Sequence, residues 1–412
     1  MTAATPRIDA ARVIADLREL DRRTGGPEGA RRVAWGEEWR AGRAFVAELL
    51  AEIGVEPERD EAGNVWAYLP GEAEPALALG SHVDSVPGGG WLDGALGVMA
   101  AVGVLRAWAQ SGRRPPRTLA LVDFADEEGA SFGRSLLGSS AFSGTLDPDD
   151  VAGLRDASGR TLADALADNG VDLRRALDAG RRRERIAAFC ELHIEQGPVL
   201  ESEGLAVAAV AGCAGVERHR LRFTGQASHA GTTPMDDRRD AGLAAAETAL
   251  AVERVAREHG GVGTAGALAL EPGIATAVAG VAELTVDLRH PGADELAAML
   301  ARTIDAGRAR AAARGCDVSA ELVWRIEPIP FDAELVGAAV EAAREAAGRT
   351  EPLTSGALHD AAEVARLMPT AMMFTSSIAG ISHAKEEDTA EADLAVAIEA
   401  FGGFAERTLA RL

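Results

Sequence analysis

The stretch "SHVDSVPGGGWLDGALGV", residues 81–98, follows a short apolar run, "ALALG" at 76–80, and contains one histidine, two aspartates and several glycines. In an extended segment the side chains of residues i and i+2 lie on one face, so Asp84 is placed to orient the His82 imidazole. Asp93 follows a glycine-rich loop, and glycine lets the backbone approach a ligand closely. A carboxylate there can bridge two cations through its two oxygens. The stretch therefore predicts a strand end that carries metal ligands.

Three further apolar runs lead into histidine or acidic residues in the same way. They are "TLALVDF" at 118–124, "IAAFCELHI" at 186–194 and "TAMMFT" at 370–375. Alanine-rich helical patterns alternate with the runs, which is typical of an α/β protein with a central mixed, mostly parallel sheet flanked by helices. Ligands of open α/β sheets bind beyond the carboxyl ends of the strands. We therefore expect the residues that follow these runs to converge in space.

The strand ends supply a full set of metal ligands. In "DFADEEGASFG" the side chains of Glu127 and Glu128 point to opposite sides, so one can bind a metal while the other faces a substrate. Imidazole and carboxylate ligands suit two borderline divalent ions that share Asp93, with Glu127 left as the general base. The predicted ligands are His82, Asp93, Glu128, His193 and His383.

Each motif taken alone has a structural alternative. A histidine beside a strand end is more often a satisfied structural residue than a ligand, and a Glu-Glu pair is usually solvated surface. Gly88, Gly89 and Gly90 alone would fit a tight turn. The occurrence of all these motifs at strand ends favours a site.

Composition limits the classes of function. The chain has 412 residues, and 47% of them are hydrophobic. This length exceeds the usual size of a domain with a single core, so we expect two domains. Its 64 acidic against 42 basic residues give a formal charge of -22, which argues against nucleic acid or an acidic membrane surface as a partner. The three cysteines, Cys190, Cys213 and Cys316, show no metal-binding spacing. The N-terminal segment, 1–20, has the pattern of an amphipathic helix rather than a signal peptide, and we expect a cytoplasmic protein.

A second pattern occupies the segment 213–326. Strands at "VERHRLRFTG", "GALALEPG" and "GVAELTVDLRH" are joined by a helix from about Asp240 to His259, and a further helix begins near Ala293. The order strand, helix, strand, strand, helix, strand is that of a ferredoxin-like α+β domain. We predict a catalytic domain formed by 1–212 and 327–412, with this domain inserted at 213–326.

The order of these motifs resembles the M20 family of co-catalytic metallopeptidases and amidohydrolases. Within it, "GSHVDSVPGGGWLDGALGV", "ELHIEQGPVL", "HAGTTPM", "DLRH" and "SGALHDA" are similar to the branch of N-carbamoyl-L-amino acid hydrolases, β-ureidopropionases and allantoate amidohydrolases. The resemblance covers essentially the whole chain. His193 stands where the peptidase branches carry an acidic ligand, which supports this branch.

The resemblance implies a division of the ligands between two ions per subunit, Zn²⁺ or Mn²⁺, Co²⁺ or Ni²⁺. His82, Asp93 and His193 would hold one ion, and Asp93, Glu128 and His383 the other. Glu127 would take a proton from a metal-bridging water, whose hydroxide attacks a ureido carbonyl. The substrate would be a small ureido or amide compound with a carboxylate.

The resemblance also assigns residues around the substrate. His229 resembles a histidine that reaches the developing oxyanion from a partner subunit, so a homodimer joined through the inserted domain is implied. Arg289 resembles the arginine that binds the substrate carboxylate, and Gln196, Gly356 and His359 match substrate-side positions. The alternative interpretations are a surface charge for Arg289, a loop residue for His229, and local hydrogen bonds for Gln196 and His359.

Some positions depart from the family pattern. Thr276 and Ala279 stand where relatives carry the asparagine and the proline of an Asn-Val-Val/Ile-Pro-Gly stretch, and Leu358 replaces a glycine. In "SHAKEED" the usual Asn-Pro after His383 is missing. Since the metal ligands are intact, these changes bear on which amide is cut.

Three other hypotheses remain besides an N-carbamoyl-L-amino acid hydrolase. An allantoate amidohydrolase or β-ureidopropionase would share every metal ligand and differ in the polarity of the pocket. A dipeptidase or aminoacylase would release no ammonia. A non-catalytic binding protein on the same scaffold would not need Glu127 together with all five ligands.

Overall fold

The computed structural model describes residues 6–412, which form two compact units, 6–211 with Phe331–Leu412 and Gly212–Pro330. Residues 1–5, the start of the predicted N-terminal helix, lie outside the described residues. The expected insertion, 213–326, differs from the second unit mainly at its end, where β15 (Ile329–Pro330) pairs with Cys213 and Gly212 of β8 (Val207–Cys213). Among the described residues, none of the helices is both long and apolar enough to cross a bilayer.

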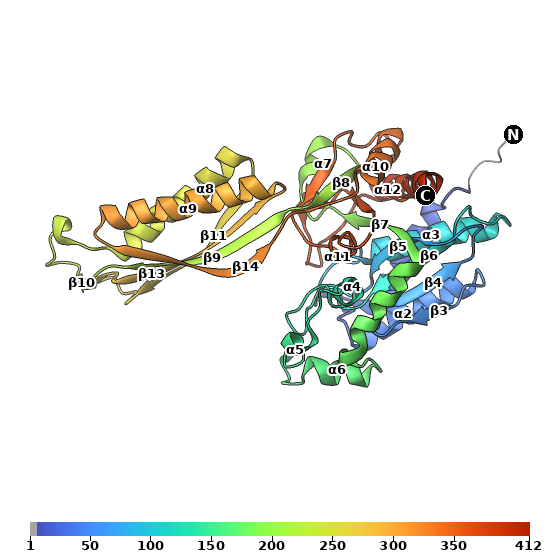
Figure 1. The fold of residues 1–412 in the computed structure, drawn as a ribbon, viewed down its shortest axis with the longest axis horizontal. Coiled ribbons are helices and arrows are strands. Elements are labelled where there is room, and N and C mark those ends of the chain that lie inside the picture. The colour runs from blue at the N-terminus through green and yellow to red at the C-terminus, as the bar shows by residue number, and fades with distance from the viewer. Residues whose placement is uncertain (1–5) are drawn as a thin grey trace. The chain divides into compact units, whose positions relative to one another are not determined.

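The first unit contains one large mixed sheet with flanking helices, as predicted (Figure 1). Its strand order is β8-β17-β7-β5-β6-β4-β3, and β16 also pairs with β8. The other elements in chain order are α1 Ala10–Thr24, β1 Gly25–Gly26, β2 Gly29–Ala30, α2 Glu37–Ala51, β3 Pro57–Arg59, β4 Val65–Leu69, β5 Ala76–His82, α3 Ala95–Gln110, β6 Leu119–Phe124, α4 Leu137–Ser143, α5 Pro148–Val151, α6 Leu162–Asp168, η1 Leu173–Arg185, β7 Ile186–Ile194, α7 Val199–Glu203, α10 Ala333–Glu345, β16 Leu353–Ser355, α11 Asp360–Val364, β17 Thr370–Thr375, η3 Ile378–Gly380 and α12 Glu391–Arg411.

The four apolar runs of the sequence form the four central strands, β17, β7, β5 and β6. These strands pair in parallel, whereas the outer pairs β8–β17, β4–β6 and β3–β4 are antiparallel. Nearly every residue of the central strands is buried, as expected for parallel strands covered on both faces. Because all four run in one direction, their carboxyl ends meet at one edge of the sheet.

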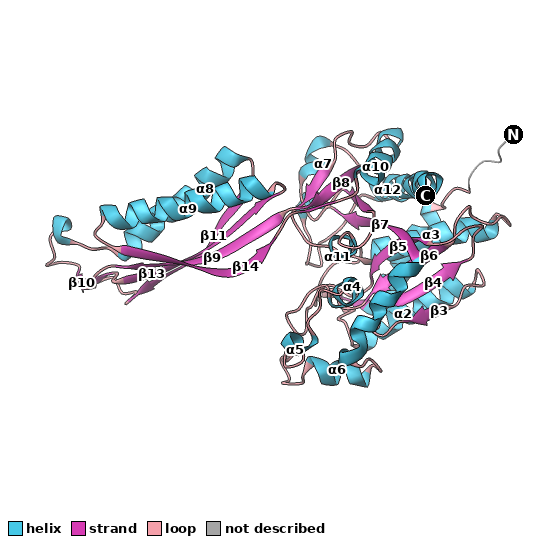
Figure 2. Cartoon of the chain, viewed as in Figure 1, coloured by secondary structure: helices cyan, strands magenta, loops and turns pink. Residues whose placement is uncertain are grey.

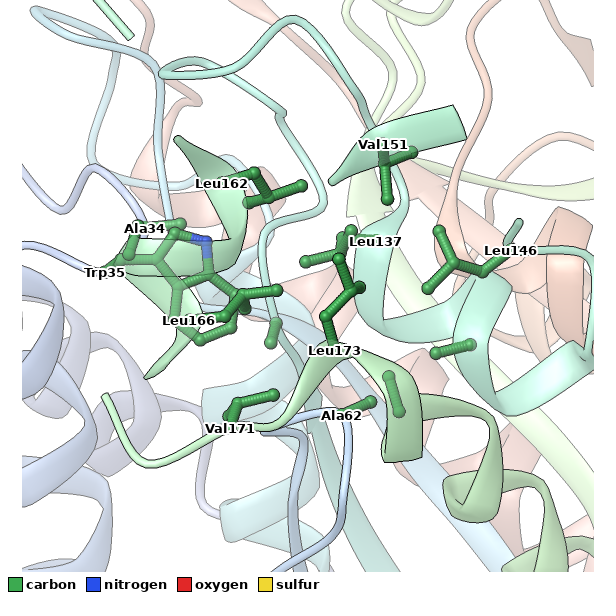
Figure 3. Close-up of a cluster of buried hydrophobic side chains, with 14 of the residues drawn as sticks. Ala34, Trp35, Ala62, Leu137, Leu146, Val151, Leu162, Leu166, Val171 and Leu173 are labelled. Atoms are coloured by element: carbon green, nitrogen blue, oxygen red, sulfur yellow. The ribbon is translucent and has the colours of Figure 1, made fainter. Parts of the chain in front are cut away.

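A separate hydrophobic cluster supports one of these strand ends (Figure 3). It gathers side chains from α4, α5, α6 and η1, including Leu137, Leu162 and Leu173, together with Trp35. The indole Nε1 of Trp35 donates a hydrogen bond to Oδ2 of Asp126 at 2.7 Å. The cluster therefore anchors the residue that directly precedes Glu127.

The second unit has the predicted order of strands and helices (Figure 2). Its elements are β9 Gly215–Thr224, β10 Ser228–His229, η2 Met235–Asp237, α8 Ala241–His259, β11 Val262–Glu271, β12 Ala277–Val278, β13 Val281–His290, α9 Ala293–Ala313 and β14 Asp317–Ile326. The antiparallel sheet has the order β11-β13-β9-β14, and α8 and α9 lie side by side on one of its faces. Asp240 caps α8 through a hydrogen bond from the Leu243 N–H at 3.1 Å, and Gly260 ends it at φ 69°.

Candidate metal centre

The first ligand group lies on two neighbouring strands and the loop that follows one of them. His82 ends β5, His193 is the penultimate residue of β7, and Asp93 precedes α3. All three are buried, and one potential ligand atom from each lies within 4.8 Å of the others. Nε2 of His193 lies 3.1 Å from Oδ1 of Asp93. The sheet thus brings together residues that are more than a hundred positions apart in the chain.

The second ligand group contains Asp93, Glu128 and His383. Nε2 of His383 lies 3.3 Å from Asp93 Oδ2 and 3.4 Å from Glu128 Oε2. Glu128 follows β6, and His383 lies in the loop after β17 with a positive φ of 57°. Asp93 therefore presents Oδ1 to one group and Oδ2 to the other, which is the arrangement of a carboxylate shared by two ions.

The donor atoms fit two divalent ions. Ligand atoms about 2.1 Å from a tetrahedral ion are about 3.4 Å from one another, close to the separations found here. Nε2 of His193 and Oε1 of Glu128 are buried without a hydrogen-bond partner, which is costly unless another group completes the site. Burial opposes ionisation of Asp93, but contacts with His193 and His383 outweigh it and lower the Asp93 pKa well below its usual range.

The two buried imidazoles are oriented by backbone carbonyls. Nδ1 of His82 lies 3.1 Å from the carbonyl oxygen of Asp84, and Nδ1 of His193 lies 3.0 Å from that of Ile194. If each Nδ1 donates its proton there, the lone pair of Nε2 faces the metal centre. The carbonyl of Asp84 is closer to His82 than its carboxylate, whose Oδ1 is 3.6 Å away.

Glu127 lies beside the first ligand group. Its Oε2 is 3.6 Å from His82 Nε2, and the residue is 8% exposed. Burial raises the pKa of Glu127 well above its usual range, and the neighbouring His82 only partly opposes this shift. A carboxylate with a high pKa next to a metal centre is suited to accept and return a proton.

Two glycines of the stretch 81–98, Gly90 and Gly94, are required because other side chains pack against them. Gly94 has φ 63°, and a Cβ there would lie 2.3 Å from Cε1 of His82, so glycine is required for Asp93 and His82 to come together. A Cβ at Gly90 would lie 2.1 Å from Oε1 of Glu387. The spacing of His82 and Asp93 therefore depends on close packing as well as on turn geometry.

Two of the predicted substrate-side residues of the first unit, Gln196 and His359, contact these ligands. Gln196, at φ 57°, donates from Nε2 to Asp93 Oδ2 at 3.0 Å. The buried ring of His359 lies 4.3 Å from that of His193, with Nε2 3.0 Å from the Ser355 hydroxyl. Burial lowers the pKa of His359 well below its usual range. Gly356 and Leu358 belong to the same 355–359 segment, so the departure at Leu358 adjoins this histidine.

The remaining candidates lie in the second unit. His229 of β10 pairs with Ala277 of β12, and the carbonyl of Thr276 accepts a hydrogen bond from Ala230 at 2.9 Å. His229 and Thr276 are therefore neighbours. Arg289 lies near the end of β13, where its Nε donates to Asp287 Oδ1 at 2.8 Å.

Sequence reasoning missed several buried carboxylates around the centre. Glu191 accepts hydrogen bonds from the Ser81 hydroxyl at 2.6 Å and the Ala361 N–H at 2.9 Å, and it forms a further possible ligand group with His193 and His359. The i, i+2 spacing of Glu191 and His193 on one strand could have indicated this. Glu387 carried no comparable signal, because its contacts are with loops.

A mixed sheet with histidine and carboxylate ligands at the ends of its parallel strands defines a hydrolase of the metallopeptidase-like class. Peptidase family M20/M25/M40 matches residues 78–407, and the chain belongs to this family. It is 35% identical to the N-carbamoyl-L-amino acid amidohydrolase of Geobacillus stearothermophilus, over 94% of each chain. It is 32% identical to the allantoate amidohydrolase of Bacillus subtilis, over 90% of this chain and 91% of that one.

Solved structures of amidases are also similar to this chain. The crystal structure of a hydantoinase/carbamoylase family amidase from Burkholderia multivorans superimposes with a TM-score of 0.89 at 31% identity, and covers 98% of this chain and 99% of that one. The family and the mixed sheet with flanking helices expected from the sequence are confirmed.

Proposed function

We propose that this protein is a dinuclear metal-dependent amidohydrolase that cleaves the ureido C–N bond of an N-carbamoyl-L-amino acid to give the amino acid, carbon dioxide and ammonia. The observation that carries the proposal is the pair of ligand groups that share Asp93, with Glu127 3.6 Å from His82. The names of its relatives support a substrate of the carbamoyl or ureide class.

The metal ions would lower the pKa of a water molecule and polarise the substrate carbonyl. Glu127 accepts one proton of that water, and the water oxygen forms a bond to the ureido carbon. The bond from this carbon to the amino-acid nitrogen then breaks, and Glu127 returns the proton to that nitrogen. The other product is carbamic acid, which keeps the second proton of the water and decomposes to carbon dioxide and ammonia.

His229 has a suitable tautomer for stabilising an oxyanion. The Gly231 N–H donates to Nδ1 of His229 at 3.0 Å, so a neutral ring carries its proton on Nε2. A neutral Nε2–H can donate to a developing negative oxygen. The side chain is exposed, as a residue that serves a site outside its own unit needs to be.

Arg289 and Thr276 would serve different sites. From Val281 to Arg289, β13 spans roughly 27 Å of extended chain, with Thr276 and His229 beyond its start and Arg289 near its end. One copy of the inserted unit cannot bring both ends to one substrate. Two copies could, with Arg289 of one subunit and the His229 end of the partner at each site, which supports a homodimer.

The second unit also carries apolar surface that a second copy could cover. Leu243 and Leu250 on α8 and Leu268 and Leu270 on the edge strand β11 are exposed, Leu250 by 72%. Exposed apolar side chains grouped along an edge strand and an adjacent helix are typical of an interface. We therefore propose that this unit forms the dimer.

Mixing two inactive variants tests the shared site. Glu127→Gln and His229→Ala homodimers should each be inactive. Exchanged heterodimers would contain one site with both wild-type residues, so an equal mixture should recover about a quarter of wild-type activity. Absence of recovery, with heterodimers demonstrated by native mass spectrometry, would exclude a contribution of His229 across subunits.

A substrate screen monitored by ammonia release tests the reaction itself, with metal content measured on the same sample. N-carbamoyl-L-amino acids should be the best substrates, and allantoate and β-ureidopropionate are the rivals. Preference for allantoate would reassign the substrate and keep the chemistry. Hydrolysis of dipeptides or N-acyl amino acids without ammonia release, or no bound metal with no turnover, would overturn the proposal.

A further inference from the structure

A buried carboxylate outside both ligand groups connects the two loops that carry metal ligands. Glu387 is 2% exposed. Its Oε1 accepts hydrogen bonds from the backbone N–H of Asp93 at 3.1 Å and of Leu92 at 3.4 Å. Its Oε2 accepts from the Ser382 hydroxyl at 2.9 Å and from the His383 N–H at 3.3 Å. One side chain thus satisfies donors from both loops.

The sheet does not fix the separation of these loops. Residues 90–93 and 382–383 lie outside helices and strands, and almost 290 positions separate them in the chain. Yet Asp93 Oδ2 and His383 Nε2 are only 3.3 Å apart. By contrast, His82 and His193 of the first ligand group lie on the paired strands β5 and β7.

The local packing is built around this carboxylate. A Cβ on Gly90 would lie 2.1 Å from Oε1 and 2.4 Å from Cβ of Glu387, so Glu387 occupies the space that a side chain at position 90 would need. Next to it, the Trp91 indole donates to Oδ1 of Asp388 at 3.1 Å. Both loops are therefore held together through consecutive residues, Glu387 and Asp388.

We propose that Glu387 is a positioning residue for the second metal ion, which deepens and rests on the proposed function. Its two oxygens set the distance between the Asp93 and His383 backbones, so that both side chains face the same ion. Because His383 and Glu128 lie outside strands, loss of Glu387 should lower the affinity for the ion at Asp93, Glu128 and His383. The ion at His82, Asp93 and His193 should be retained.

The test compares Glu387→Ala and Glu387→Gln with a matched control, Glu386→Ala, whose side chain is exposed on the same loop. Purified chains are stripped of metal and titrated with Co²⁺, with the absorption spectrum and the ions per chain measured. Wild type and Glu386→Ala should bind two ions. Glu387→Ala should bind one with unchanged affinity and the second 10- to 100-fold more weakly, about the effect of removing groups that orient metal ligands.

The affinity of Glu387→Gln for the second ion should lie between those of wild type and Glu387→Ala. The amide oxygen can accept from the Asp93 and Leu92 N–H groups, but the amide nitrogen then opposes the His383 N–H, which is also a donor. Partial rescue by glutamine separates positioning from mere filling of space. Thermal unfolding of each variant shows whether the fold is retained.

The outcomes separate this inference from the proposed function. Two ions bound with wild-type affinity by Glu387→Ala would overturn the role of Glu387 and leave the hydrolase proposal standing. An equal loss of affinity for both ions, or loss of folding in both Glu387 variants, would show that Glu387 stabilises the fold in general. Either result would also overturn the inference. A wild-type chain that binds no Co²⁺ would overturn both.

Discussion

The carboxylate of Asp84 accepts a hydrogen bond from the backbone N–H of Glu128, with Oδ2 3.1 Å from the nitrogen. Its other oxygen, Oδ1, is 3.3 Å from the backbone nitrogen of Glu127. Asp84 therefore orients the turn that carries the proposed base and a metal ligand, while its carbonyl orients His82. The i, i+2 argument from the sequence predicted that the Asp84 side chain orients His82, whereas the carbonyl of Asp84 makes the shorter contact with the ring.

Replacing Asp84 with asparagine should lower kcat by 10- to 100-fold, the range for groups that orient metal ligands. Asparagine has one acceptor oxygen, so its amide nitrogen would oppose one of the two backbone N–H groups. KM should change little because Asp84 is fully buried and exposes no surface to a substrate. Steady-state kinetics check this, and a variant with wild-type kcat would show that the turn is held by other contacts.

Glu127→Gln should retain both metal ions and lose turnover by about 10²- to 10⁴-fold, the usual contribution of a general base. Glutamine has nearly the same shape but cannot accept the proton. Ammonia release and metal content on one preparation provide the measurement. Substantial activity in this variant would require a different base.

Gly94→Ala should disrupt the first ligand group, because its Cβ would lie 2.3 Å from the His82 ring. A positive φ alone costs a non-glycine residue about 1–2 kcal/mol. Gly133→Ala is the control, since Gly133 has φ 72° and no atom within 4 Å of an added Cβ. Only Gly94→Ala should lose metal, and equal loss in both variants would implicate backbone strain instead.

Without metal, the fold should become less stable as pH rises from about 4.5 to 9. Burial raises the pKa of Glu128 to about 7, whereas an unfolded glutamate ionises near 4.5. The folded state therefore holds more protons in this window, so its free energy of unfolding falls as pH rises. The contact with Asp93 raises the pKa of His383 to about 9, and the stability that this contributes below pH 6.5 is lost through pH 9.

The measurement is the melting temperature of the chelated and the Zn²⁺-loaded protein at pH 5.5, 7 and 9. The chelated protein should melt lower at each step, and the increase in melting temperature on adding Zn²⁺ should grow with pH. A melting temperature of the chelated protein that rises over this range would contradict the assignment of these buried groups.

The four central strands and the residues at their ends could be identified from local sequence patterns. Continuous apolar runs bounded by polar residues identify buried parallel strands. The topology of a parallel sheet places its ligand site beyond the carboxyl ends of the strands. His82 and His193 could be selected in this way because a strand fixes where its last side chains lie, and Glu128 because it closely follows the end of β6. Helix α8 was equally readable, since Asp240 and Gly260 cap it through local interactions.

The tertiary structure alone decided how the loops meet. The contacts of Glu387 with Asp93 and His383, and of Asp84 with the Glu127–Glu128 turn, join segments far apart in the chain and have no periodicity that a sequence could display. The same holds for Gly94, whose need for glycine arises from the His82 ring packed against it. Local patterns specify elements, whereas the distances that define a metal centre depend on close packing between elements, which only the folded chain specifies.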